Sequence, residues 1–333
     1  MLTRGAQAIP ADSMTAKIHH YVPQCYLKGF ARHRDEPKLF VIDGNEQRSF
    51  VTNPKNVASE QHFHRIDAEG YPPDALESAF GNFEGELGPA LERIIEARSL
   101  KNENDRAYLL NLMALIAVKN PRQRENFRSF HEAVAKRIMD LATATSERWE
   151  SQIRRAKANG LVAKDAAVSY EEMRAFVEKD EFKIETTTDY HLKLEMQSFE
   201  TVLPYFVHRN WVLFRAPKGK TGFVTSDHPV CLMWTDPAER GRFHGPGHGL
   251  LGTQIVFPVS NELALIGAFE AREDEIDANE LRIAQINGTV IVHARRQIYA
   301  RHSDFLYKLH HNRKIMRGSE LLKDKECARG QRR

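Results

Sequence analysis

The stretch LESAFGNFEGELGPALERII, residues 76–95, decides the fold class of this chain. Its large apolar side chains recur at steps of three and four residues: Leu76, Phe80, Phe83, Leu87, Leu91 and Ile94. That spacing puts them on one face of a helix, so the stretch predicts an amphipathic helix packed on a core. Residues 109–117 repeat the pattern, and Pro121 is expected to kink or restart the helix because proline lacks a backbone donor.

The helical pattern covers residues 74–205. Ser169 and Glu172 have the spacing of a capping box, in which each side chain bonds the backbone amide of the other at a helix start. A last helix is expected to run from about Tyr190 to Leu203 and to end near Pro204.

Strand patterns lie on both sides of the helical region. Residues 39–43 and 48–52 read as two short strands, and Asp43-Gly44-Asn45 between them is typical of a turn. After the helical region, apolar or β-branched runs are separated by Gly, Pro and Asn. These runs are residues 211–215, 222–225, 254–258 and 262–266, followed by a helix over 281–293 and a closing strand over 297–301.

The order of these patterns predicts an α+β fold, with a large helical block inserted between two β-containing segments. The C-terminal part is expected to be a mainly antiparallel sheet. We expect one domain over residues 15–308, comprising an N-terminal motif region (15–70), the helical block (74–205) and a β-rich region (206–308). Residues 1–14 are expected to be a disordered leader. Residues 309–333, with eight Lys or Arg against three acids, are expected to be a solvated basic tail.

The composition excludes several classes of protein. The 333 residues carry 48 Lys or Arg and 45 Asp or Glu, a net charge of +3, which is weaker than a dedicated nucleic-acid-binding domain usually shows. No apolar run approaches the 18 or so residues of a membrane span. The three cysteines are far apart and odd in number, which indicates a reducing cytoplasm rather than a disulfide scaffold. The chain also holds 15 histidines, which direct attention to metal and proton chemistry.

The string KIHHYVPQ, residues 17–24, contains a histidine pair before an apolar residue and a proline. A neutral imidazole can bind a transition metal or accept a proton near neutral pH. His19 and His20 are therefore candidates for both tasks. The alternative is that His20 is a buried, hydrogen-bonded residue and His19 a surface residue.

His62 and His64 form a second candidate pair. If their segment is extended, alternate side chains point to the same face and both could bind one cation. The alternative is a polar strand edge.

These two regions together resemble the HNH endonuclease pattern, although the CxxC knuckle of that family is absent. The resemblance implies that His20 is a general base and His19 a metal ligand. Asn56 would orient the base or bind backbone, and His62 or His64 would complete the site for Mg²⁺, Mn²⁺ or Zn²⁺.

A second resemblance covers residues 17–300. HYVPQ (20–24), TSDHPV (225–230) and FPVS (257–260) resemble the signatures of a bacterial family known only as domain of unknown function 4238. KNPR (119–122) with Arg124, and Asn287, resemble two further elements. This resemblance implies a bacterial or phage-related intracellular protein and no particular activity.

Asp227 and His228 follow a predicted strand and precede a proline. Three consecutive side chains such as Ser226, Asp227 and His228 cannot act as a catalytic triad, whose members converge from separate elements. Asp227 at a strand end could instead bind a metal with His228, act as a base, or cap the turn. Arg122 and Arg124 could bind a phosphate, or pair at the surface with acids such as Glu125.

The first hypothesis is a divalent-metal-dependent phosphodiesterase, a nuclease in a defence or mobile-element setting, with nucleic acid as its partner. In this hypothesis His20 is the base, Asp227 with His228 or His62/His64 holds the metal, and Asn287 contributes to the site. The alternative is a non-catalytic binding or scaffold protein with the helical block as its partner surface. Hydrolysis of a small phosphorylated or acyl substrate is a third hypothesis. The oligomeric state and the identity of the metal stay open.

Overall fold

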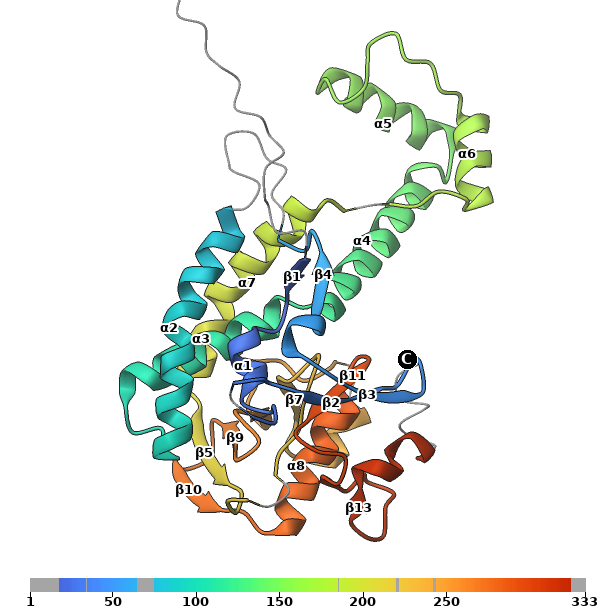
Figure 1. The fold of residues 1–333 in the computed structure, drawn as a ribbon. Coiled ribbons are helices and arrows are strands. Elements are labelled where there is room, and N and C mark those ends of the chain that lie inside the picture. The colour runs from blue at the N-terminus through green and yellow to red at the C-terminus, as the bar shows by residue number, and fades with distance from the viewer. Residues whose placement is uncertain are drawn as a thin grey trace, which may run out of the picture. The chain divides into compact units, whose positions relative to one another are not determined.

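The computed structural model describes residues 18–33, 35–64, 75–184, 186–219, 222–241 and 244–324. The chain divides into two compact units, of which unit 1 is Met1–Asn120 with Leu192–Arg333 and unit 2 is Pro121–His191 (Figure 1). The expected leader, residues 1–14, lies outside the described residues. None of the helices in these described ranges is long and apolar enough to cross a bilayer.

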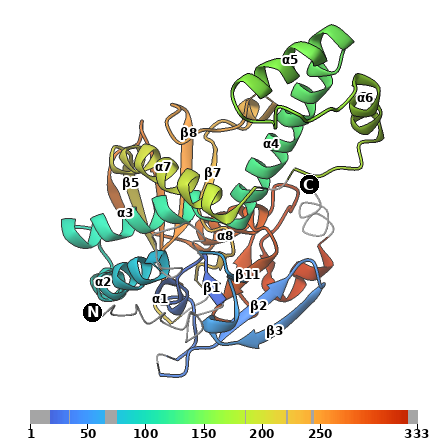
Figure 2. The same ribbon diagram turned by 90° about the horizontal axis from the view of Figure 1, so that it is seen from above.

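One sheet of unit 1 joins segments from the two ends of the chain. Its strands lie in the order β3-β2-β11-β6, each antiparallel to its neighbours. Figure 2 shows β3, β2 and β11 side by side. They are β2 (Leu39–Asp43), β3 (Arg48–Thr52), β6 (Thr225–Ser226) and β11 (Gln297–Ala300). The predicted hairpin is confirmed, and its turn is held by Asp43, whose Oδ1 accepts the amide hydrogens of Asn45 and Glu46 at 3.1 and 3.0 Å.

The second sheet of unit 1 has five strands in the order β10-β5-β9-β8-β7. They are β5 (Asn210–Arg215), β7 (Cys231–Trp234), β8 (Thr253–Pro258), β9 (Leu263–Ala268) and β10 (Asp274–Asp277). Only β10 and β5 are parallel, so the predicted mainly antiparallel C-terminal sheet and the α+β class are confirmed.

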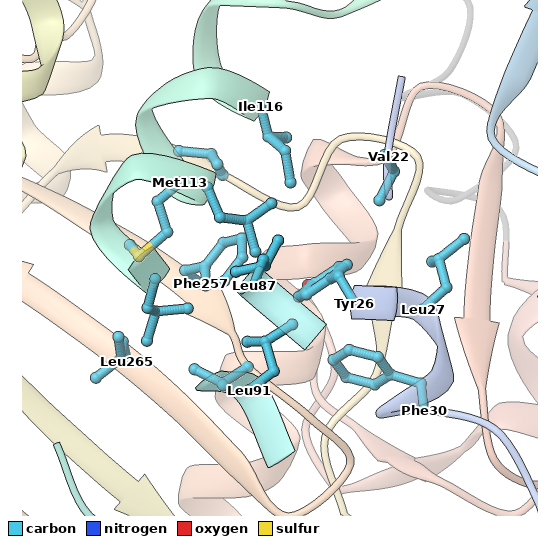
Figure 3. Close-up of a cluster of buried hydrophobic side chains, with 14 of the residues drawn as sticks. Val22, Tyr26, Leu27, Phe30, Leu87, Leu91, Met113, Ile116, Phe257 and Leu265 are labelled. Atoms are coloured by element: carbon cyan, nitrogen blue, oxygen red, sulfur yellow. The ribbon is translucent and has the colours of Figure 1, made fainter. Parts of the chain in front are cut away.

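Helices cover both faces of the five-stranded sheet. Alternate residues of a strand point to opposite faces, and Phe257 packs with Leu87 and Met113 in one core cluster (Figure 3). Its neighbour Val256 packs in a second cluster with Val290. The helices of unit 1 are α1 (Gln24–Lys28), α2 (Ala75–Ala97), α3 (Glu103–Val118), most of α7 (Thr188–Val207) and α8 (Glu280–His293).

The described residues of unit 1 also form two small ribbons and three short 3₁₀ helices. Strand β1 (Ile18–His20) pairs antiparallel with β4 (Ser59–Gln61), and β12 (Leu306–Tyr307) pairs with β13 (Met316–Arg317). The 3₁₀ helices are η1 (Pro54–Asn56), η2 (Pro237–Gly241) and η3 (Gly318–Lys323).

Unit 2 consists of α4 (Pro121–Ala142), α5 (Ser146–Ala158), α6 (Tyr170–Lys179) and the first turn of α7. Helix α4 begins at Pro121, as predicted, because a proline at the first helical position loses no intrahelical hydrogen bond. The capping box of Ser169 and Glu172 at the start of α6 is confirmed.

The predicted helix end near Pro204 is wrong, since α7 continues to Val207. Proline removes one backbone hydrogen bond. The residues after it are stabilised by packing, because Phe206 is fully buried and its carbonyl oxygen accepts the Nε1 hydrogen of Trp211 at 2.9 Å.

The predicted strand over residues 222–225 is wrong for its first part, since β6 contains only Thr225 and Ser226. Two asparagines, rather than a neighbouring strand, accept the backbone amide hydrogens of residues 223 and 224. The amide of Phe223 donates to the backbone oxygen of Asn261 at 2.8 Å, and the amide of Val224 donates to Oδ1 of Asn287 at 3.0 Å.

The predicted basic tail, residues 309–333, is folded over residues 309–324. Leu309 and Leu321 are buried in the same core cluster as Val290 of α8. Residues 325–333 lie outside the described residues.

Gly288 allows α8 to pack closely on residues 306–309. A Cβ at this position would clash with the carbonyl oxygen of Lys308. We expect Gly288→Ala to lower the free energy of unfolding by about 1–3 kcal/mol, measured by urea denaturation. Gly85→Ala in α2 is the matched control, because nothing lies within 4 Å of a Cβ built there and alanine favours a helix. Equal losses in the two variants would contradict this prediction.

Candidate functional site

Three side chains from three different elements of unit 1 come together. They are His19 in β1, His64 just after β4, and Glu77 in the first turn of α2. One ligand atom of each lies within 4.8 Å of those of the other two. Both histidines are buried, whereas the side chain of Glu77 is 34% exposed. Imidazole and carboxylate groups at this spacing can bind a metal ion.

The ribbon of β1 and β4 positions the two histidines. Ile18 is exposed and His19, paired with Glu60 across the ribbon, points inward. The chain turns after β4, and the backbone amide of His64 donates to Nδ1 of His19 at 2.7 Å. The two imidazole rings stack with their centroids 5.2 Å apart and 13° between their planes.

The hydrogen bonds of His64 define its tautomer. Burial, the largest cause, together with the charge of Lys119 lowers the pKa of His64 to about 3, so the ring is neutral at neutral pH. Its Nδ1 lies 2.7 Å from Oε2 of Glu77, an acceptor, so Nδ1 carries the hydrogen and Nε2 keeps a lone pair. Nε2 is buried without a hydrogen-bond partner. An ion bound to that nitrogen would lie on the opposite side of the ring from Glu77, so an ion shared by His64 and Glu77 would have to bind at Nδ1 of His64 instead.

His20 points away from His19, since neighbours in a strand face opposite sides. Its Nε2 donates to the carbonyl oxygen of Lys55 at 3.2 Å, and Nε2 of Gln24 lies 3.5 Å from its Nδ1. Burial lowers the pKa of His20, which leaves its ring neutral. Its role as general base stays a prediction.

Three charged residues of the site are absent from the sequence-based candidates: Glu77, Glu84 and Lys119. Glu84 lies two turns after Glu77 on α2, and burial raises its pKa while Lys119 lowers it. Burial also disfavours the charged form of Glu77, but its hydrogen bond to His64 and the nearby positive charges hold its pKa below the usual range. The sequence signals for these residues are weak: two glutamates seven apart on one helix, and the lysine of KNPR.

His62 and Asn56 lie apart from this cluster. Residues 62–64 are not extended, because β4 ends at Gln61 and His62 has a φ of 55°, so the condition under which His62 and His64 would face the same side is not met. That left-handed turn leaves His62 exposed while His64 is buried. Asn56 is exposed, and its side chain donates to Oγ1 of Thr52 at 3.0 Å.

Asp227 anchors a turn. Its carboxylate accepts three backbone amide hydrogens at 2.8–3.0 Å, those of Arg295, Arg296 and Gln297. Burial raises its pKa to about 6, so it is ionised at neutral pH. The amide of His228 donates to Oγ of Ser226 at 3.1 Å. In the part of the chain that the structure describes, neither Asp227 nor His228 belongs to a metal-ligating group of three.

Asn287 connects three segments of unit 1. Besides accepting the amide of Val224, its Nδ2 donates to the carbonyl oxygens of Gly222 and Leu306 at 3.0 and 2.7 Å. These contacts indicate a structural role.

Arg122 and Arg124 lie in the first turn of α4, in unit 2. Arg122 is exposed and Arg124 is half-buried. Glu125, the acid suggested as their partner, pairs with Arg128 at 2.6 Å.

The fold and the site define an α+β protein with a buried His-His-Glu cluster at its N-terminal ribbon. The family described as "Protein of unknown function (DUF4238)" matches residues 18–304, so the chain belongs to that family. The similarity to HNH endonucleases is not shown. No curated protein and no solved structure matches the chain.

Proposed function

We propose that this protein is a divalent-metal-dependent hydrolase whose ion is held by His19, His64 and Glu77. The observation that supports this proposal is the proximity of the three ligand atoms, which lie within 4.8 Å of one another. Two imidazoles and one carboxylate favour Zn²⁺ or Mn²⁺ over Mg²⁺, which prefers oxygen ligands.

The three residues fit such an ion with a small local adjustment. Zinc–ligand bonds of about 2.0–2.1 Å place tetrahedral ligand atoms about 3.3 Å apart, so the side chains would close by up to about 1.5 Å. His19 would contribute Nδ1, which now accepts the amide hydrogen of His64, and binding would therefore replace that hydrogen bond. An ion shared by His64 and Glu77 would lie between Nδ1 of His64 and Oε2 of Glu77 and would replace the hydrogen that these two atoms share.

The proposed reaction is hydrolysis of a phosphodiester in nucleic acid. A bound divalent ion would act as a Lewis acid on a phosphoryl oxygen. Glu84 lies two turns from Glu77 on α2, and burial raises its pKa, which favours a role as proton donor, while His20 is the predicted base. A small phosphorylated substrate would use the same groups.

Metal dependence tests the proposal. We expect the purified protein to bind about one equivalent of Zn²⁺ or Mn²⁺ in equilibrium dialysis and to cleave plasmid DNA, RNA or bis(p-nitrophenyl) phosphate only with the ion present. A chelator should abolish cleavage, and the ion should restore it. Absence of Zn²⁺ and Mn²⁺ binding would overturn the proposal and favour a binding or scaffold protein. Cleavage of only the small ester would retain the hydrolase and reject nucleic acid as substrate.

A further inference from the structure

A cavity lies between β5, β10 and the turn that joins α2 to α3. Its volume is about 370 Å³, near the lower end of the range of about 300–1,000 Å³ for small-molecule sites. Leu100 of the turn and Trp211 and Leu213 of β5 form its apolar part. Trp211 and Leu213 are two residues apart in the strand, so both face the side on which α2 and α3 pack. The size and the apolar part suit a ligand about as large as an amino acid.

Hydrogen bonds position the charged walls of this cavity. Arg106 of α3 binds both carboxylate oxygens of Glu273, the residue before β10, with one contact at 3.1 Å. Glu275 of β10 accepts the hydroxyl hydrogen of Ser99 at 2.5 Å and the amide hydrogen of Leu100 at 3.3 Å. These contacts connect β10 to α3 and to the turn before it. They give the cavity fixed walls, and they already provide partners for Arg106, Glu273 and Glu275.

Lys101 and Asp274 are the other two charged residues that line the cavity. Lys101 is exposed in the turn before α3, and Asp274 is exposed in β10. Oδ1 of Asp274 accepts the amide hydrogen of Glu275 at 2.8 Å, which leaves Oδ2 for a ligand. In the part of the chain that the structure describes, neither the Lys101 nor the Asp274 side chain forms an ion pair. The cavity therefore offers one positive and one negative group beside an apolar surface.

We propose that this cavity binds an α-amino acid with an apolar side chain, such as leucine or phenylalanine. Lys101 binds the α-carboxylate, Asp274 binds the α-ammonium group, and the side chain of the ligand covers the apolar part. A ligand with only one charge would leave either Lys101 or Asp274 without a counterpart. A single unpaired charge is ordinary on a protein surface, whereas two opposite charges at one apolar cavity match a zwitterion. Burial of the ligand's side chain is the main source of affinity.

The test is isothermal titration calorimetry of the purified protein with three ligands that share a phenyl ring. Phenylalanine carries both charges, 3-phenylpropanoate lacks the ammonium group, and 2-phenylethylamine lacks the carboxylate. We expect phenylalanine to bind with a Kd of about 1 mM or lower. The other two ligands should bind about fivefold more weakly, because each loses one exposed ion pair. Glycine, which lacks the apolar side chain, should bind at least about tenfold more weakly than phenylalanine.

Two variants assign the two charges. Lys101→Met should weaken phenylalanine binding about fivefold and leave 2-phenylethylamine binding unchanged. Asp274→Asn should weaken phenylalanine binding by a similar factor and leave 3-phenylpropanoate binding unchanged. Both positions are exposed, so we expect both variants to fold. The matched controls are Lys28→Met in α1 and Asp277→Asn in β10, which are exposed positions outside the cavity lining and should bind as the wild type does.

Three results would overturn the amino-acid site. They are no saturable binding of phenylalanine, equal affinities for the three phenyl ligands, and wild-type affinity for phenylalanine in both Lys101→Met and Asp274→Asn. The cavity shares no residue with the cluster of His19, His64 and Glu77, so the titration needs no metal ion. The proposed hydrolase is tested separately by metal binding in equilibrium dialysis, and either proposal can fail without the other.

Discussion

The His64→Ala variant is expected to lose metal binding and hydrolysis together. His64 is buried, and its Nδ1 lies 2.7 Å from Oε2 of Glu77, where an ion shared by the two residues would bind. Its removal takes away both a ligand and the group that positions Glu77. Altering such a supporting group alone commonly costs 10–100-fold in metal affinity, so we expect a loss of at least about 100-fold. Equilibrium dialysis with Zn²⁺ and cleavage of bis(p-nitrophenyl) phosphate measure the two effects.

His62→Ala is the matched control for this prediction. It removes the same side chain two residues away, at an exposed position. It should leave both metal binding and activity unchanged. Because His64 is buried, its replacement by alanine also removes packing. Glu77→Gln is therefore a second variant, which keeps the shape of the Glu77 side chain and removes its charge. Full metal affinity in folded His64→Ala and Glu77→Gln would refute the assignment of the ligands.

The Asp227→Ala variant is expected to lose about 3–5 kcal/mol of unfolding free energy. Its buried carboxylate accepts the amides of residues 295–297, and removal leaves three backbone donors without their acceptor. Hydrogen bonds to a charged group contribute about 1.5–3 kcal/mol each, and their losses at one site overlap. Urea denaturation measures the loss. Metal affinity, measured under conditions where the variant is folded, should equal that of the wild type.

Asp236→Ala is the control for the Asp227 prediction. Asp236 also accepts a backbone amide, that of Ala238 at 2.8 Å, but at an exposed turn where water can replace it. Its loss should cost less than about 1 kcal/mol. If Asp227→Ala keeps its stability and loses metal affinity, then Asp227 belongs to the site, as one sequence hypothesis has it.

The sequence predicts those elements whose determinants are local. Residues 39–52 form the expected hairpin because the turn residues and both strands are contiguous, and α2 forms because its apolar stripe recurs within the helix. The sequence does not predict strands β1 and β4. Each has only three residues, mostly polar, and each forms only by pairing with the other strand, about 40 positions away. The same holds for residues 222–224, whose partners Asn261 and Asn287 come from distant segments.

The candidate site is partly predictable for the same reason. His19 and His64 are visible in the sequence because histidine is rare and its chemistry is distinctive. Their pairing with each other, rather than with His20 and His62, follows from the register of the ribbon and the left-handed turn at His62. Glu77 and Lys119 carry no comparable signal, because glutamate and lysine are common on helices and only the packing of unit 1 brings them to the two histidines.

The sheet order β3-β2-β11-β6 has a consequence for how the protein is made. During synthesis β2 leaves the ribosome with only β3 beside it, and its other edge waits for more than 250 residues until β11 follows. An isolated two-stranded hairpin is marginally stable in water. The N-terminal region that carries His19 and His64 therefore lacks its completed sheet until translation is nearly finished, and an unpaired strand edge of this kind can pair with other chains in the meantime.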